Sequence, residues 1–241
     1  MSFIRARRGL ICALLAGLVA AACSSSGPGP HVGAPKLPHT YLFDKAGAPD
    51  AAWVVYDSAH SGDPHARVPS PVNVEHGVLR VATTGDQGSG LCLCGATAKP
   101  EKPYGRWDVR ARVSVNPDHG FAILLWPNSN RWPQDGEIDL AEFPGDNRSL
   151  LQTTLHYGAE NHRVMKFTHG NFATWHTYSV DWRPSALTFL LDGRTVLRVT
   201  DQAAIPNTPM HLALQAGVNE GVTTPSDTSA TLDVARVRVS R

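Results

Sequence analysis

Hydrophobic and polar residues alternate with a period of two along much of the chain. In residues 105–115, apolar side chains from Trp107 to Val113 occupy every second position, with polar or charged residues between them. This alternation is typical of a β-strand with one buried face. Residues 121–126 are apolar throughout, as expected for a strand buried on both faces. The pattern therefore predicts strands over both segments.

Similar short segments recur up to the C-terminus. Asp192-Gly193 between two of them is a strong β-hairpin signal. The strands that we expect cover residues 78–82, 105–115, 121–126, 137–143, 151–157, 175–182, 187–191, 195–199, 211–216 and 231–239. This series favours an all-β fold, a sandwich of two antiparallel sheets. An exposed concave sheet would form a long cleft, which suits a polymer better than a small metabolite.

Composition and charge narrow the range of functions. The 241 residues are 42% hydrophobic, enough for one sizeable domain with a real core. The 21 glycines and 18 prolines agree with many turns. A formal net charge of +1 is too balanced for a nucleic-acid-binding surface, so we expect no nucleic-acid partner.

Residues 1–22 have the pattern of an export signal. Arg5, Arg7 and Arg8 precede an apolar run that is too short for a convincing membrane-spanning helix. Cys23 follows three alanines, an arrangement that resembles a bacterial lipoprotein signal in which this cysteine carries the lipid. We expect an extracellular or cell-surface protein, lipid-anchored via Cys23, with free secretion as the alternative. Membrane contact would occur only through that anchor.

The residues after the signal divide into a tether and a domain. Residues 23–40 are rich in proline, glycine and serine, as is typical of a flexible tether. We expect the folded domain to comprise residues 41–241.

Cys92 and Cys94 allow two interpretations. On a regular strand their Cα atoms would lie about 6.5–7 Å apart, at or beyond the comfortable limit for a disulfide. Two small buried hydrophobic residues, or a strained disulfide in an oxidising exterior, both fit. A metal site is disfavoured, because the chain has no second cysteine pair.

The segment from Glu137 to Glu142 carries three acids. Glu137 and Asp139 share one face of a strand, but strict alternation would turn Glu142 toward the core. An unpaired carboxylate there would be costly. One extra residue, a β-bulge at Leu140-Ala141, would return Glu142 to the acidic face. The sequence thus predicts three acids on one surface.

Two carboxylates that flank a glycosidic bond are what glycoside hydrolysis requires, and in retaining enzymes they lie about 5–5.5 Å apart. Like charges this close cannot all remain ionised cheaply, so we expect at least one raised pKa. Spacing alone leaves two alternatives open, a solvated acidic strand edge and a calcium site.

The surrounding residues resemble glycoside hydrolase family 16, the laminarinase and β-glucanase group. The resemblance extends over residues 41–239 and rests on Phe43-Asp44, Asn73 to Leu79, Tyr104 to Arg112, Gly136 to Phe143, Thr154 to Gly158, Trp175 to Tyr178, Asp181-Trp182 and Leu191 to Gly193. It implies a β-jelly-roll with a concave substrate cleft and a retaining mechanism that needs no cofactor.

The resemblance also implies roles for the three acids. Glu137 would be the nucleophile, Asp139 its supporting acid and Glu142 the general acid/base. The bulged spacing favours an endo-β-1,3-glucanase, with a galactan- or agarose-type hydrolase second. A transglycosylase on the same scaffold and a non-catalytic glucan-binding protein remain alternatives. The partner in each case is a polysaccharide, and we expect a monomer.

Four further residues are candidates for sugar contacts. Trp126 and Trp132 flank the loop before the acidic strand, and indole rings stack on the apolar faces of sugars. By resemblance, His156 and Gln215 face the cleft. Packing in the core is the alternative for both tryptophans, and a structural role is the alternative for His156.

By the same resemblance, Gly77 and Asp233 match the positions that hold a structural calcium ion in many members. Calcium takes six to eight oxygen ligands, and only these two are identifiable here. The calcium site is therefore an open hypothesis.

Overall fold

The computed structural model describes residues 38–57, 67–69, 71–98, 103–144, 148–219 and 221–241. The predicted signal, Cys23 and the tether as far as residue 37 lie outside this part of the chain. The first strand begins at His39, slightly before the expected start of the domain at residue 41. In the described segments, no helix is both long and apolar enough to cross a membrane.

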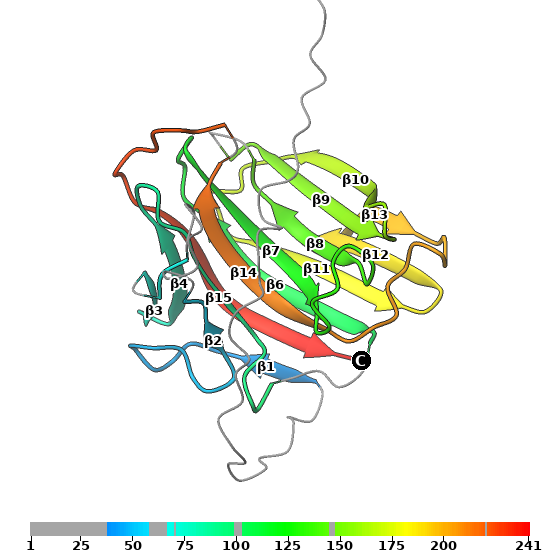
Figure 1. The fold of residues 1–241 in the computed structure, drawn as a ribbon. Helices are drawn as coiled ribbons and strands as arrows, with labels where there is room; N and C mark the ends of the chain where they lie inside the picture. Colours follow the sequence, from blue (N-terminus) through cyan, green and yellow to red (C-terminus); the bar gives the residue numbers. More distant parts are fainter. Residues whose placement is uncertain (1–37, 58–66, 70, 99–102, 145–147, 220) are drawn as a thin grey trace, which may run out of the picture.

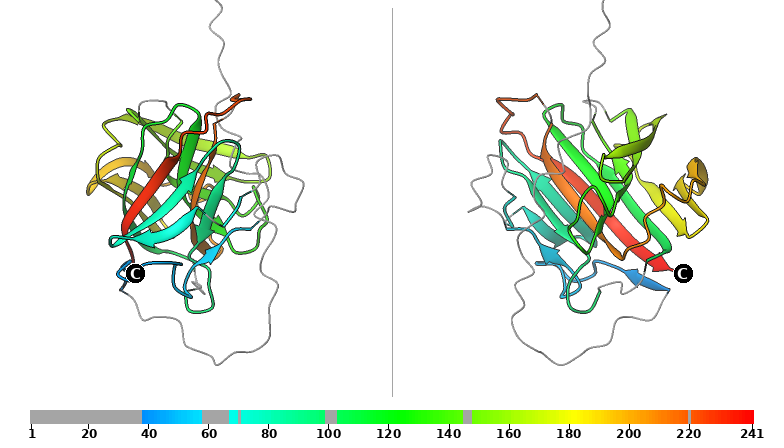
Figure 2. Two further views of the ribbon diagram at one scale, coloured as in Figure 1. Left: turned by 90° about the vertical axis from the view of Figure 1, so that its left-hand side faces the viewer. Right: turned by 45° about the vertical axis from the view of Figure 1, so that its right-hand side comes forward.

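The described chain forms two antiparallel sheets, as predicted, which lie face to face (Figures 1 and 2). The back sheet in Figure 1 has eight strands, in the order β13-β12-β11-β6-β15-β4-β3, with β1 also paired to β15. Its strands are β1 (His39–Tyr41), β3 (Val72–Glu75), β4 (Val78–Thr83), β6 (Gly105–Val113), β11 (His176–Arg183), β12 (Ala186–Leu191), β13 (Arg194–Val199) and β15 (Ala230–Ser240).

The second sheet has seven strands, in the order β10-β9-β8-β7-β14-β5-β2, and faces the viewer in Figure 1. Its strands are β2 (Val54–Val55), β5 (Ser89–Cys92), β7 (His119–Pro127), β8 (Glu137–Glu142), β9 (Leu150–Tyr157), β10 (His162–His169) and β14 (Met210–Val218). We call this seven-stranded sheet the front sheet.

Alternating side chains of both sheets fill the space between them. In β6, Trp107, Val109 and Ala111 point into this core, as their period-two spacing predicted. In β7, Phe121 and Ile123 join the same core, whereas the intervening Ala122 and Leu124 are buried in a separate small cluster on the outer face of the front sheet. The expectation that this strand is buried on both faces is therefore confirmed.

Cys92 and Cys94 form a disulfide. Strand β5 ends at Cys92 and the chain bends at Leu93, so the two Cα atoms lie 5.2 Å apart. The bend explains the difference from the longer distance expected of a regular strand. The bridge belongs to a small cluster with Tyr56.

Candidate active site

The three acids lie on the strand β8, in the middle of the front sheet. Pairing with β7 aligns Leu124 with Asp139 but Ile123 with Ala141, so Leu140 is the extra residue of a bulge. The pairing of β8 with β9 shifts between Asp139 and Glu142 as well. Because Leu140 and Ala141 both join the inner core, the alternation is reset at this point. The predicted bulge is confirmed.

Cross-strand pairing shows which face each acid occupies. On β9, His156 lies opposite Glu137, Thr154 opposite Asp139 and Gln152 opposite Glu142. Residues paired directly in antiparallel strands share a face, and His156, Thr154 and Gln152 alternate along β9. All three acids therefore face away from the inner core, on one side of the front sheet.

Gly136 holds the backbone in place just before Glu137. It has a φ of +81°, and a Cβ atom there would lie 2.8 Å from Pro206 Cγ and 2.9 Å from the carbonyl oxygen of His156. Both the left-handed conformation and the close approach exclude a side chain. The start of the acidic strand is thus fitted against β9 and the loop that contains Pro206.

Glu137 is almost fully buried and accepts a hydrogen bond from Trp132. The indole Nε1 lies 2.7 Å from Glu137 Oε2. A charge-assisted bond of this kind orients the carboxylate and favours its ionised form. The predicted sugar platform Trp132 is therefore also a direct partner of the predicted nucleophile.

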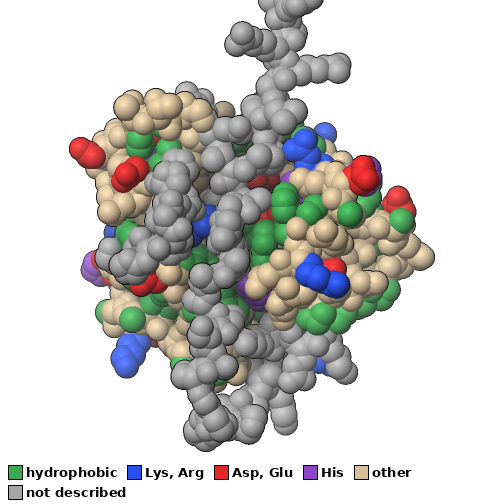
Figure 3. Space-filling view, viewed as in Figure 1, with side chains coloured by type: hydrophobic (Ala, Val, Ile, Leu, Met, Phe, Trp, Pro, Cys, Tyr) green, Lys and Arg blue, Asp and Glu red, His purple; other side chains and the backbone are tan. Residues whose placement is uncertain are grey.

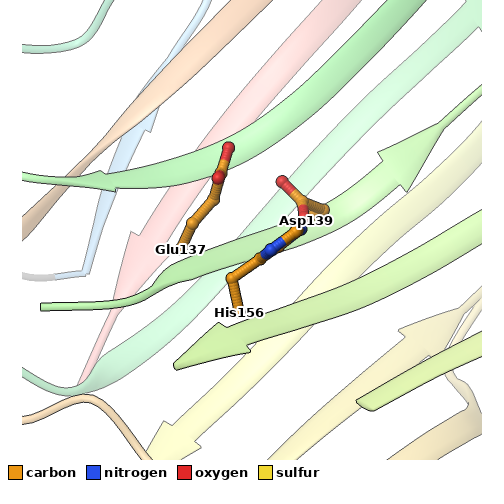
Figure 4. Close-up of side chains that lie close together, drawn as sticks. All are labelled: Glu137, Asp139 and His156. Carbon is orange, nitrogen blue, oxygen red and sulfur yellow. Dashed lines mark ion pairs between the residues drawn. The ribbon is translucent and has the colours of Figure 1, made fainter. Parts of the chain in front are cut away.

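Asp139 and His156 point toward each other from neighbouring strands (Figure 4). His156 Nε2 lies 3.4 Å from Asp139 Oδ2, and His156 Nδ1 lies 2.6 Å from Asn161 Oδ1. Polar atoms of Glu137, Asp139 and His156 all fall within 4.8 Å of one another. The three groups form one compact polar cluster beneath the surface of the face.

Glu142 lies at the end of β8 and is more accessible than the other two acids. Its Oε2 accepts hydrogen bonds from Gln152 Nε2 at 2.7 Å and Thr154 Oγ1 at 2.8 Å. These two donors fix one carboxylate oxygen while the residue stays open to solvent. A positioned, accessible carboxyl suits exchange of a proton with a substrate or with water.

Burial shifts the pKa values of the two inner acids. It raises the pKa of Glu137 well above its ordinary range, and the nearby Asp139 carboxylate raises it further. His156 and the Trp132 hydrogen bond act in the opposite direction on that pKa. Burial and the charge of Glu142 likewise raise the pKa of Asp139. Raised pKa values are what we expected of like charges this close, and two neighbouring buried carboxyls favour one shared proton over two charges.

Trp126 is buried beside Trp132. Its ring stacks on that of Trp132, with centroids 6.4 Å apart and planes at 12°, and its Nε1 donates to Asn130 Oδ1 at 2.9 Å. The stack supports the Trp132 ring from one side. The structure thus brings both predicted tryptophans to the acids, with Trp132 nearer to them.

Gln215 lies on β14, opposite Ala122 of β7, so it shares the face of the acids. Its side-chain oxygen accepts a bond from Arg67 Nη2 at 3.1 Å, and among the described residues its Nε2 has no hydrogen-bond partner. The side chain is fully buried, so the structure places Gln215 on the acidic side of the sheet but gives it no exposed surface toward a sugar.

The predicted calcium ligands lie in the back sheet and its β3–β4 turn. Asp233 Oδ1 accepts from Arg80 Nε at 3.1 Å, and Oδ2 accepts from Arg112 Nε at 3.0 Å. Gly77 occupies the turn with a φ of +75°. Because guanidinium groups bind both oxygens of this carboxylate, the surroundings of Asp233 do not fit a calcium ligand set.

Sequence reasoning missed Gln152, Thr154 and Asn161. The available signal was the spacing of β9, because Gln152 and Thr154 alternate with His156 at period two. Asn161 follows the strand in a turn, and no periodicity marks it.

The family model Glycosyl hydrolases family 16 matches residues 71–236. The chain is 26% identical over 194 residues to a beta-glucanase of Rhodothermus marinus, a match that covers 69% of this chain and 68% of that protein. It is 30% identical over 106 residues to a glucan endo-1,3-beta-glucosidase of Cryptopygus antarcticus, covering 40% of this chain and 39% of the relative.

Solved structures show the same fold. The laminarinase from Rhodothermus marinus superposes with a TM-score of 0.71 at 25% identity, over 86% of this chain and 99% of that one. The agreement includes the two-sheet architecture on which the acids lie.

Proposed function

The chain belongs to glycosyl hydrolases family 16, and we propose that it is a retaining endo-β-1,3-glucanase. The observation that carries the proposal is the bulge in β8, which places Glu137, Asp139 and Glu142 on one face of the front sheet. The names of the relatives support β-glucan as the substrate class.

The geometry supports a double displacement in two steps. In the first, a Glu137 oxygen attacks the anomeric carbon while the Glu142 carboxyl gives its proton to the departing glycosidic oxygen. In the second, Glu142 takes a proton from water, whose oxygen attacks the same carbon and releases Glu137. Asp139 shares a proton with Glu137 and so limits the charge repulsion within the buried pair.

The substrate is tested with laminarin, lichenan, agarose and galactan, and new reducing ends are measured. We expect turnover to be highest on laminarin. Higher turnover on agarose or galactan would instead support the galactan-type alternative, and turnover on none of the four would overturn the hydrolase proposal.

The two glutamates are separated by azide rescue on an activated aryl β-glucoside. In Glu137→Ala, azide replaces the nucleophile, so the glycosyl azide has inverted anomeric configuration. In Glu142→Ala, azide attacks the enzyme-bound intermediate, so the configuration is retained. The same configuration from both variants would contradict the assigned roles.

Two alternatives share this site. A transglycosylase uses the same nucleophile but passes the glycosyl group to a sugar hydroxyl, so products longer than the substrate would appear at high oligosaccharide concentration. A non-catalytic glucan-binding protein would bind the glucan without cleaving it, and neither glutamate variant would form a glycosyl azide.

We further propose that the protein acts at the cell surface, anchored by a lipid on Cys23. The proposal rests on the sequence around this cysteine. Cys23→Ala should move the protein from the membrane fraction to the soluble fraction, and an unchanged distribution would contradict anchoring. We propose a monomer, which sedimentation velocity tests.

A further inference from the structure

Two large hydrophobic side chains lie exposed on β10, the outermost strand of the front sheet (Figure 1). Met165 is 36% exposed and Phe167 is 42% exposed. One residue separates them, so they lie on the same face of the strand. Val164, on the opposite face, packs against the inner core. Met165 and Phe167 therefore lie on the outer face of the front sheet and do not extend the inner core.

Register places this pair on the face that carries the acids. Met165 lies opposite Thr154, and Phe167 lies opposite Gln152. Those two β9 residues are the hydrogen-bond donors to Glu142. Since neighbouring strands are about 4.8 Å apart, the backbone of Phe167 lies roughly 10 Å from that of Glu142. Figure 3 shows this face of the molecule, where hydrophobic side chains lie among charged and other side chains at the upper right.

A hydrophobic pair on an edge strand is a liability, because exposed edges invite pairing with other chains. Arg163 and Lys166 place positive charge on the same strand and oppose such pairing. A sugar ring suits this surface better than a strand of another chain does, because the apolar C–H face of a sugar stacks on an aromatic side chain such as that of Phe167. The flexible Met165 side chain adapts to the irregular surface of such a ring.

We propose that Met165 and Phe167 form an outer sugar-binding subsite on the face that carries the acids, here called the β10 platform. It binds a sugar residue of the β-glucan chain some distance from the bond that is cleaved. The inference rests on the proposed function and extends it, because the platform would make the enzyme favour long chains over short ones. No bond forms or breaks there.

The test compares kcat/KM on β-1,3-gluco-oligosaccharides of increasing length. In the double variant Met165→Ala/Phe167→Ala, we expect the ratio of kcat/KM on long chains to that on short chains to fall about tenfold, equivalent to about 1.4 kcal/mol. Lys166→Ala is the matched control, because it removes an exposed side chain from the opposite face of β10, and it should keep the wild-type ratio. Phe167→Trp should keep the preference for long chains.

Three further measurements separate sugar binding at the platform from a general loss of apolar surface and from misfolding. Val115→Ala removes an apolar side chain that is 59% exposed in another part of the molecule, and it should also leave the ratio unchanged. On the inactive background Glu137→Gln, the double substitution should weaken binding of the longest oligosaccharide by a similar factor. A thermal melt close to wild type would show that the double variant is folded.

Failure of the platform proposal can be told apart from failure of the proposed function. If the wild type cleaves β-1,3-glucan and the double variant keeps the wild-type ratio, the platform is wrong and the proposed function stands. If the wild type cleaves no β-glucan, both fall. If the double substitution converts a dimer to a monomer in sedimentation velocity, the surface is an interface between copies of this chain, which overturns the proposal.

Discussion

Individual side chains around Glu137 set its protonation, and they act in opposite directions. The Trp132 N–H favours the carboxylate, whereas burial and Asp139 favour the protonated form. The nucleophile must be ionised to attack, so activity should be lost as the pH falls through the pKa of the Glu137–Asp139 pair.

Trp132→Phe removes the hydrogen bond that lowers the pKa of Glu137. The acidic limb of the profile of kcat/KM against pH should move to higher pH, and kcat should fall roughly tenfold or more, since a bond to a charged group contributes about 1.5–3 kcal/mol. Asp139→Asn removes a negative charge, so the same limb should move to lower pH. Shifts of the two variants in one direction would contradict these opposing effects on the nucleophile.

The raised pKa values also predict how stability depends on pH. A carboxyl whose pKa is higher in the folded state than in the unfolded state does not destabilise the fold below the unfolded pKa of about 4. As the pH rises from there through the folded-state pKa, the folded protein loses stability relative to the unfolded chain. Asp139→Asn removes part of that loss. Its Tm should therefore exceed that of the wild type at neutral pH, and the difference should shrink as the pH falls toward 4. A constant difference across the pH range would disprove the link.

Strands with one buried face were predictable, and strands without a buried face were not. The ten expected segments match β4, β6, β7, β8, β9 and β11 to β15 closely. Strand β10 escaped prediction because almost all of its side chains are exposed, so no alternation of buried and exposed positions marks it. Strand β5 is short and contains a glycine, which weakens its pattern.

The acidic strand was predictable for a different reason, because a buried unpaired Glu142 would be too costly without a bulge. Its partners Gln152 and Thr154 were not predicted, because their positions depend on the register between β8 and β9. The register is set by how the two strands pair with each other. The pattern of one strand alone therefore does not say which residue lies opposite Glu142.

Gly136→Ala tests how tightly the start of β8 is fitted against β9. The substitution combines an unfavourable positive φ with contacts under 3.0 Å, so it should lower both Tm and kcat. Gly193→Ala is the matched control, because its φ of +78° is similar but no atom lies within 4 Å of the added Cβ. It should lower Tm by less and leave kcat unchanged. Equal effects on kcat would contradict a local role for Gly136.

Across the assembled sandwich, the back sheet supports the acids without contributing one of them. Asp233 joins strands β4 and β6 to β15 through Arg80 and Arg112, and its side chain is nearly buried. This arrangement ties three neighbouring strands together by charge-assisted hydrogen bonds, in a place where the family resemblance raised the hypothesis of a metal ion.

Removal of calcium should therefore have little effect on stability. We expect EDTA to leave Tm unchanged, whereas Asp233→Asn should reduce the free energy of unfolding by roughly 1.5–3 kcal/mol. The measurement is thermal and urea unfolding with and without added calcium. A clear fall of Tm in EDTA that calcium restores would support the metal hypothesis instead.

The pairing of β1 with β15 has a mechanical consequence. His39 lies opposite Val239 and Tyr41 opposite Val237, so the first described strand forms its ladder with the back sheet. Tension applied to the chain before His39 would act on this short ladder and pass into β15 of the back sheet. Strand β8 lies in the front sheet and would not carry this force directly. The acids should therefore keep their alignment under tension until β1 detaches from β15.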